Sequence, residues 1–138
     1  MADGFALSLQ KGLRAALVAN SGVTDLVGSR IYDEPPQDVT FPYIRFGEIS
    51  PDAFDTDNIE GALVGFGIEV HSRSASGRVE AMRIVEAVKA ALHRQEVSVT
   101  TTGFTLVELI FLTFSGTRDS SGRGYTATIA LQAMLETA

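Results

Sequence analysis

Two stretches of the chain repeat apolar residues at the spacing of an amphipathic helix. Across residues 4–19 the apolar positions fall three and four residues apart, with Lys11 and Arg14 between them. Residues 76–94 show the same period over a wider stripe that includes several alanines. We therefore predict two main helices, with a short helical turn at residues 24–27 that Thr24 caps and Gly28 ends.

Other stretches alternate apolar and polar residues, which is the pattern of a half-buried strand. Residues 109–112 depart from it because all four are apolar. Residues 50–61 are mostly polar and residues 115–124 contain three glycines, so we predict a polar loop for the first and a turn or hairpin tip for the second. The predicted strands cover residues 30–33, 43–49, 62–71, 104–114 and 125–135.

The predicted strand at residues 62–71 has two unlike faces. One face carries large apolar residues, and the other carries Gly65, Gly67 and Glu69. Small residues in a strand indicate a bend or a partner that packs closely against them. The order of elements predicts one α+β domain over residues 1–138, with two main helices on one face of a mostly antiparallel sheet and a long C-terminal β-hairpin.

Composition narrows the possible functions. The chain has 17 acidic and 11 basic residues, so its net charge is −6 and the positive surface of a nucleic-acid-binding protein is missing. The absence of cysteine from the sequence removes disulfides, thiolate metal sites and thiol catalysis. The N-terminal residues do not form a basic segment followed by an apolar one, so we expect no export by the usual signal. No apolar run is as long as a membrane span, so we expect no insertion in a bilayer.

Sequence motifs for catalysis are missing or misplaced. Ser8 and Lys11 have the spacing of a serine acyl-enzyme motif, but they fall inside the first predicted helix and have no partner motif. His71 and His93 are not spaced as metal ligands, and we predict surface or capping roles for both. We therefore expect no enzyme, no cofactor and no metal site. The remaining enzymatic alternative is a small enzyme that uses scattered Ser, His and Asp residues.

Charge is unevenly distributed along the chain. Residues 25–69 hold ten acidic residues against Arg30 and Arg45, whereas residues 70–138 hold seven basic residues against six acidic ones. One interpretation is a solvated acidic loop with ordinary flanks. The other is a head-to-tail contact between copies, in which acidic and basic surfaces meet and which closes into a ring where the rotation permits.

A series of short motifs along the chain resembles one protein family. In order, they are Leu26-Val27-Gly28-Ser29-Arg30-Ile31-Tyr32, Pro35, Phe41-Pro42-Tyr43, Val70-His71-Ser72-Arg73, Gly77-Arg78, Ala81, Ala87, Ala91-Leu92-His93 and Arg118-Asp119. In this order and spacing the chain resembles the tail terminators, which are small tail-completion proteins of long-tailed phages and phage-like gene transfer agents. None of these motifs is catalytic, and together they span most of the chain.

The resemblance implies a structural protein of the virion, placed at the head–tail junction after assembly in the bacterial cytoplasm. Such a protein forms a ring, generally of six subunits, that caps the tail tube at its proper length. The ring presents a surface to the head-completion or stopper protein, and its lumen is part of the DNA path. A net charge of −6 fits a conduit that DNA crosses without specific binding, because acidic residues repel phosphates.

We predict two groups of contact residues on this basis. The first group lines the channel or touches the axial neighbour, and consists of Asp52, Asp55, Asp57 and Glu60. The second contacts neighbouring subunits or the tube, and consists of Arg118, Asp119 and Arg123. Arg73, Arg78 and Arg83 are either partners of an acidic surface or part of a solvated helix face. The alternative function is a small dimeric α+β binding or assembly module unrelated to virions.

Overall fold

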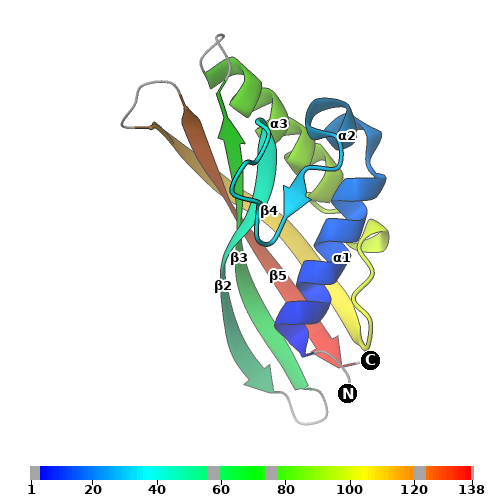
Figure 1. Ribbon diagram of the computed structural model, residues 1–138. Helices are drawn as coiled ribbons and strands as arrows, with labels where there is room; N and C mark the ends of the chain where they lie inside the picture. Colours follow the sequence, from blue (N-terminus) through cyan, green and yellow to red (C-terminus); the bar gives the residue numbers. More distant parts are fainter. Residues whose placement is uncertain (1–3, 56–59, 74–77, 120–123, 138) are drawn as a thin grey trace.

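The computed structural model describes residues 4–55, 60–73, 78–119 and 124–137, which form a layer of helices on one face of a five-stranded sheet (Figure 1). The helices are α1 (Phe5–Ala19), α2 (Ser21–Val27) and α3 (Arg78–Leu92), and a short 3-10 helix, η1 (Glu96–Ser98), follows α3. The strands are β1 (Ile31–Tyr32), β2 (Tyr43–Asp55), β3 (Glu60–Ser72), β4 (Phe104–Arg118) and β5 (Tyr125–Thr137). The predicted α+β fold is confirmed.

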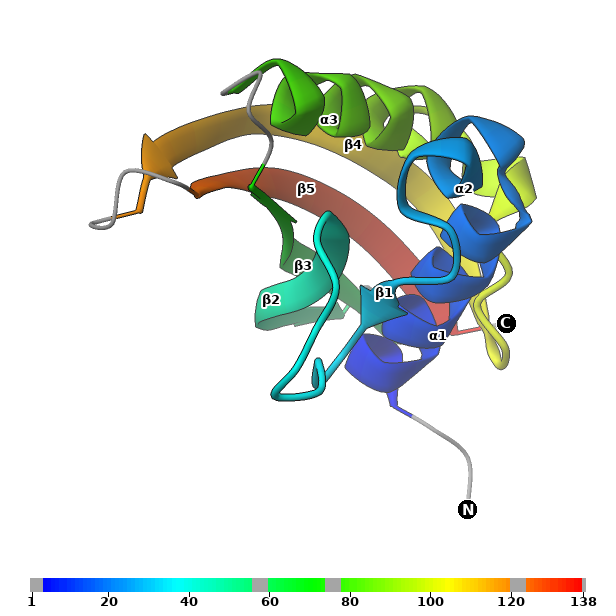
Figure 2. The same cartoon turned by 45° about the horizontal axis from the view of Figure 1, so that its top comes forward.

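Long antiparallel strands dominate the sheet. Their spatial order is β1-β2-β3-β5-β4, in which only the two-residue strand β1 pairs in parallel among the described strands. Strands β3 and β5 pair continuously from Gly61 opposite Glu136 to Ser72 opposite Tyr125. Figure 2 shows β4 and β5 as long curved strands, with α3 running along them.

The core lies between the sheet and the helices. Every second residue of β3 and β5 faces the helices and is buried, as the alternation in the sequence predicts. Burial of each large aliphatic side chain contributes about 1.5–3 kcal/mol. Fully buried members of this core from helices and strands include Leu9, Leu13, Leu17, Ile84, Val88, Leu92, Ile68, Ile129, Leu131 and Leu135.

The junction of α1 and α2 depends on one polar side chain. Asn20 ends α1 and caps α2, because its side-chain oxygen accepts a hydrogen bond of 3.2 Å from the backbone N–H of Val23. Thr24 was predicted as this cap, but α2 begins at Ser21, so Thr24 lies within the helix. Gly28 ends α2 with φ of 61°, a conformation that glycine adopts without steric cost.

The predicted loop at residues 50–61 is wrong over most of its length. Strand β2 continues to Asp55 and β3 begins at Glu60, with Asp52 opposite Leu63 and Asp55 opposite Glu60 in the ladder. Strand pairing uses backbone groups, so polar side chains do not prevent it. For the same reason β4 continues to Arg118, beyond the predicted start of the turn at residue 115.

We predict that Gly12→Ala destabilises the fold. A Cβ atom at Gly12 would collide with the backbone carbonyl of Thr100, which is packed against α1. The clash outweighs the higher helix propensity of alanine, so we expect a loss of about 1–3 kcal/mol in urea unfolding. Gly4→Ala is the matched control, since a Cβ at Gly4 meets no atom within 4 Å. Equal stability of the two variants would contradict close packing at Gly12.

Candidate functional site

One face of the sheet is covered by helices, and no described element covers the opposite face, which we call the open face. Alternate residues of β3 and β5 point toward it, including Gly65, Gly67, Thr128 and Ala130. These residues are small, so the backbone of the sheet lies near the surface there. The open face is therefore a natural place for another chain to approach closely.

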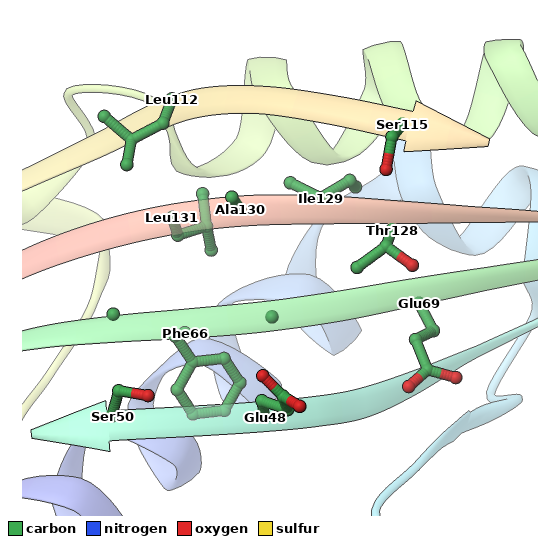
Figure 3. A pocket seen from close by; sticks show the side chains of 12 residues that line it. Glu48, Ser50, Phe66, Glu69, Leu112, Ser115, Thr128, Ile129, Ala130 and Leu131 are labelled. Carbon is green, nitrogen blue, oxygen red and sulfur yellow. The ribbon is translucent and has the colours of Figure 1, made fainter.

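A shallow groove of about 540 Å³ crosses the open face (Figure 3). Glu48 and Glu69 lie on its β2–β3 side, and Leu112 and Ser115 come from β4 (Figure 3). Two carboxylates and no cation are among the residues that line it. The lining residues are Glu48, Ser50, Gly65, Phe66, Gly67, Glu69, Leu112, Ser115, Thr128, Ile129, Ala130 and Leu131.

Irregularities in the two flanking strands help to shape this groove. The β2–β3 register shifts between Phe46 and Ile49, and the β4–β5 register shifts between Phe111 and Thr113. The intervening residues include Glu48 and Leu112, both of which are exposed. A bulge turns a side chain away from the regular alternation of a strand, and here one acidic and one apolar side chain lie on the two sides of the groove.

Two glycines allow this packing. A Cβ atom at Gly67 would lie 3.4 Å from the backbone nitrogen of Glu48, and one at Gly47 would lie 3.0 Å from Oε2 of Glu69. The small residues of β3 were predicted to mark a bend or a closely packed partner. One closely packed partner belongs to the same chain, because the irregular segment of β2 lies directly against Gly67.

One end of the open face holds a cluster of aromatic and charged side chains. The ring of Tyr43 stacks on that of His71, with centroids 4.7 Å apart and an interplanar angle of 11°. Phe41 packs on Tyr43 at 5.1 Å, and the guanidinium of Arg73 lies 4.4 Å from the centre of the Phe41 ring. The motif cluster, as we call it, consists of Phe41, Tyr43, Glu69, His71, Arg73, Asp119 and Thr126.

Hydrogen bonds join the polar members of the motif cluster. Nε2 of His71 lies 2.9 Å from Oε1 of Glu69, so this nitrogen carries a proton that it donates to the carboxylate. The hydroxyl of Thr126 lies 3.3 Å from Nδ1 of His71 and 3.4 Å from Oδ1 of Asp119. A hydroxyl donates one proton, so the full chain of bonds forms only when both nitrogens of His71 are protonated.

The motif cluster also has a buried phenol. Burial, as the largest influence, raises the pKa of Tyr43 above its ordinary value of 10, and the nearby Arg45 opposes this shift. Nε of Arg45 is itself buried and has no hydrogen-bond partner among the described residues. An unpaired buried donor of this kind is rare in folded proteins.

Sequence motifs that lie far apart in the chain meet in this cluster. Phe41 and Tyr43 precede and begin β2, His71 and Arg73 end β3, and Asp119 follows β4. The first motif joins the same region, because Nε of Arg30 donates a hydrogen bond of 2.8 Å to the carbonyl of Pro42 and β1 pairs with β2. Three of the motifs that carry the family resemblance therefore build one site.

The predicted contact residues are only partly brought together. Asp52 and Asp55 belong to β2, and Glu60 begins β3. Arg118 is exposed at the end of β4. Asp119 joins the motif cluster through Thr126. Asp57 and Arg123 lie outside the described residues.

Ser8 and His93 both make structural hydrogen bonds. Ser8 lies inside α1, is buried and donates a hydrogen bond of 2.9 Å to the carbonyl of Thr102. Nδ1 of His93 accepts a hydrogen bond of 3.0 Å from the backbone of Phe111, so this histidine caps part of the free edge of β4. Within the described residues there is no group of three side chains that could hold a metal ion. No helix there is long and apolar enough to cross a membrane.

The sequence did not reveal the groove. Glu48 and Leu112, which lie on its two sides, belong to irregular segments whose position depends on strand register. One signal was available, because the apolar run at residues 109–112 breaks the alternation that a regular strand would keep.

The fold defines the class as small two-layer α+β proteins with one uncovered sheet face. Comparison with known families is more specific: residues 11–136 match the family described as "Tail completion protein gp17". The chain belongs to this family and is a structural protein of a phage-type tail, and hence a virion component. The predicted resemblance to tail-completion proteins is confirmed.

A solved structure supports the fold. This chain is similar to a chain in the structure described as "Virion of native gene transfer agent (GTA) particle", with a TM-score of 0.88 and 24% sequence identity. The match covers 98% of this chain and 99% of the other. No curated protein sequence matches the chain.

We predict that Thr126→Val weakens the motif cluster. The substitution keeps the shape of the side chain but removes the hydroxyl that lies between His71 and Asp119. We expect a loss of about 1 kcal/mol in urea unfolding. Thr128→Val is the control, because Thr128 is exposed two positions along the same face of β5. A loss no greater than that of the control would show that the hydroxyl is not a stabilising link.

Proposed function

We propose that this protein is a tail terminator. It forms a ring, generally of six subunits, that caps the tail tube when the tube reaches its proper length. The opposite side of the ring joins the head-completion or stopper protein. The protein works as a structural part of the head–tail junction, with no catalytic reaction, no cofactor and no metal.

The observation that carries this proposal is the meeting of the family motifs at one end of the open face. Buried residues that a family shares can be explained by packing in the core. Arg73 is exposed and Phe41 is half-buried, so both can contact another protein. Exposed aromatic and arginine side chains are the residue types that anchor protein interfaces. Membership of the tail completion family makes the other proteins of the tail the expected partners.

The DNA path is the second part of the proposal. Asp52 and Asp55 belong to β2 and Glu60 begins β3, at the end of the sheet far from the motif cluster, and Asp57 lies outside the described residues. We propose that this acidic hairpin lines the channel or touches the axial neighbour. Carboxylates facing a channel repel phosphates, so DNA passes without being held.

Family membership weighs against the alternative of a dimeric module unrelated to virions. The uneven charge of the molecule points in the same direction. A two-fold dimer places the same patch on both sides of its interface, so it gains nothing from separate acidic and basic surfaces, whereas a head-to-tail contact does.

Deletion of the gene tests the function directly. We expect overlong or irregular tail tubes and unattached heads when particles are imaged by negative-stain electron microscopy, because nothing then ends tube growth. Expression of the gene in trans restores normal particles. Particles of normal tail length with attached heads in the deletion strain would reject the terminator function.

Neutralising the acidic hairpin tests the channel. We expect Asp52→Asn, Asp55→Asn, Asp57→Asn and Glu60→Gln in one chain to leave the fold intact but lower the yield of joined, infective or DNA-transferring particles. The matched control neutralises four exposed acids elsewhere: Asp25, Glu34, Asp38 and Glu86. Both variants change the net charge equally, so equal particle titres would reject a special role for the hairpin.

A further inference from the structure

The groove on the open face and helix α1 carry opposite charge. The groove on the open face has Glu48 and Glu69 and no cation among its lining residues. On the helical side, α1 has Lys11 and Arg14 and no acidic residue. The acidic groove and the basic side of α1 therefore lie on opposite layers of the molecule.

The exposed stripe of α1 has a specific pattern. Leu7, Lys11, Arg14 and Val18 recur at intervals of four, three and four residues, so they share one side of the helix. Leu7 is 45% exposed and Val18 is 40% exposed, which is unusual for aliphatic residues of a helix that packs its other side into the core. The stripe thus presents two cations between two exposed aliphatic side chains.

The groove is complementary to this stripe. Glu69 is already paired with His71, but the exposed Glu48 can meet a cation such as Arg14. Leu112, which is 54% exposed on the other side, can meet an aliphatic side chain. Its floor contains Gly65, Gly67 and Ala130, which leave room for a helix to approach the sheet closely.

Helix α3 is a poorer match. Its exposed residues include Arg83 and Lys89, but the acidic Glu86 lies between them. A helix of mixed charge placed on two carboxylates gains less than one that carries cations alone.

We propose that the groove on the open face of one copy receives the Leu7–Val18 stripe of α1 from a second copy. The contact is head to tail, because it joins opposite faces of the molecule, and repeating it builds a ring or an open helix according to the rotation between copies. This inference rests on the proposed function, since it identifies the two surfaces that meet between neighbouring subunits of the ring.

Engineered cysteines test the contact without interference, because the chain has no cysteine of its own. Thr128→Cys lies in the groove, and Ala15→Cys is exposed on α1 beside Arg14. Under mild oxidation of assembled particles, we expect the double variant to give a ladder of covalent oligomers beyond the dimer. Each single variant can give at most a dimer.

The control pairs Thr128→Cys with Ala90→Cys, which is exposed on α3. A ladder from this pair as strong as that from the α1 pair would overturn the choice of α1 as the occupant. The lack of a ladder from the α1 pair in particles that contain the protein would overturn the contact itself. Cross-links to the tube protein alone would assign the groove to that partner and would also overturn the proposed contact between copies.

Charge reversal gives an independent test in a deletion strain. We expect Glu48→Arg alone and Arg14→Glu alone each to lower the yield of joined particles at least about tenfold, because like charges then face each other in every contact. Co-expression of the two variants restores assembly, since alternating copies pair opposite charges at each contact. Arg83→Glu on α3 is the control and leaves the yield unchanged.

The outcomes separate this contact from the terminator function. Normal particles from both single variants would overturn the contact while leaving the function intact. A co-expressed pair that is as defective as either variant alone would do the same, provided that circular dichroism shows both variants to be folded. Normal particles from the deletion strain itself would reject the function.

Discussion

The continuous pairing of β3 with β5 is the constraint on which the rest of the structure depends. Along this ladder most large apolar side chains of both strands face the helices, and Gly65, Gly67 and Thr128 face the open side. A shift of one residue would expose Ile68 and Ile129 and bury Glu69 and Thr128, at a cost of many kcal/mol. The register is therefore fixed, and it also fixes which residues form the groove.

The same register assembles the motif cluster. His71 lies opposite both Tyr43 and Thr126 in the two ladders of β3, so its ring can stack on one neighbour and reach the hydroxyl of the other. Asp119 joins because it directly follows β4, and Thr126 is the second residue of the neighbouring strand β5. A cluster built in this way is held by the whole sheet, which gives a loop-rich end of the molecule a defined surface for its partners.

Local patterns predicted the elements well where the side chains decide the structure. The period of α1 and α3 and the alternation in β3 and β5 result directly from burial on one side, so both were readable in the sequence. The loop at residues 50–61 was misjudged because backbone pairing, which polar composition does not reveal, extends β2 and β3 through it. Composition indicates how many apolar side chains a segment can bury. Two strands can pair through their backbones without burying many side chains.

The site was less predictable than the fold for a physical reason. His71 and Asp119 are brought together by long-range register, and Glu48 and Leu112 take their positions from strand irregularities. The motifs could be listed from the sequence, and their order carried the family resemblance, but nothing local indicates that three of them meet. The basic residues of α1 were visible in the sequence, whereas the acidic groove on the opposite layer depends on the fold.

A contact between exposed charges suits a subunit that must assemble only at the right place. Each such ion pair contributes about 1 kcal/mol or less, so two free copies bind weakly and stay apart at low concentration. In a closed ring every subunit makes two contacts. The contact that closes the ring costs no further translational freedom, so the ring is far more stable than its open precursors. For the proposed ring, a tube end that holds several copies side by side would raise their effective concentration, so that a weak contact suffices for closure there and not elsewhere.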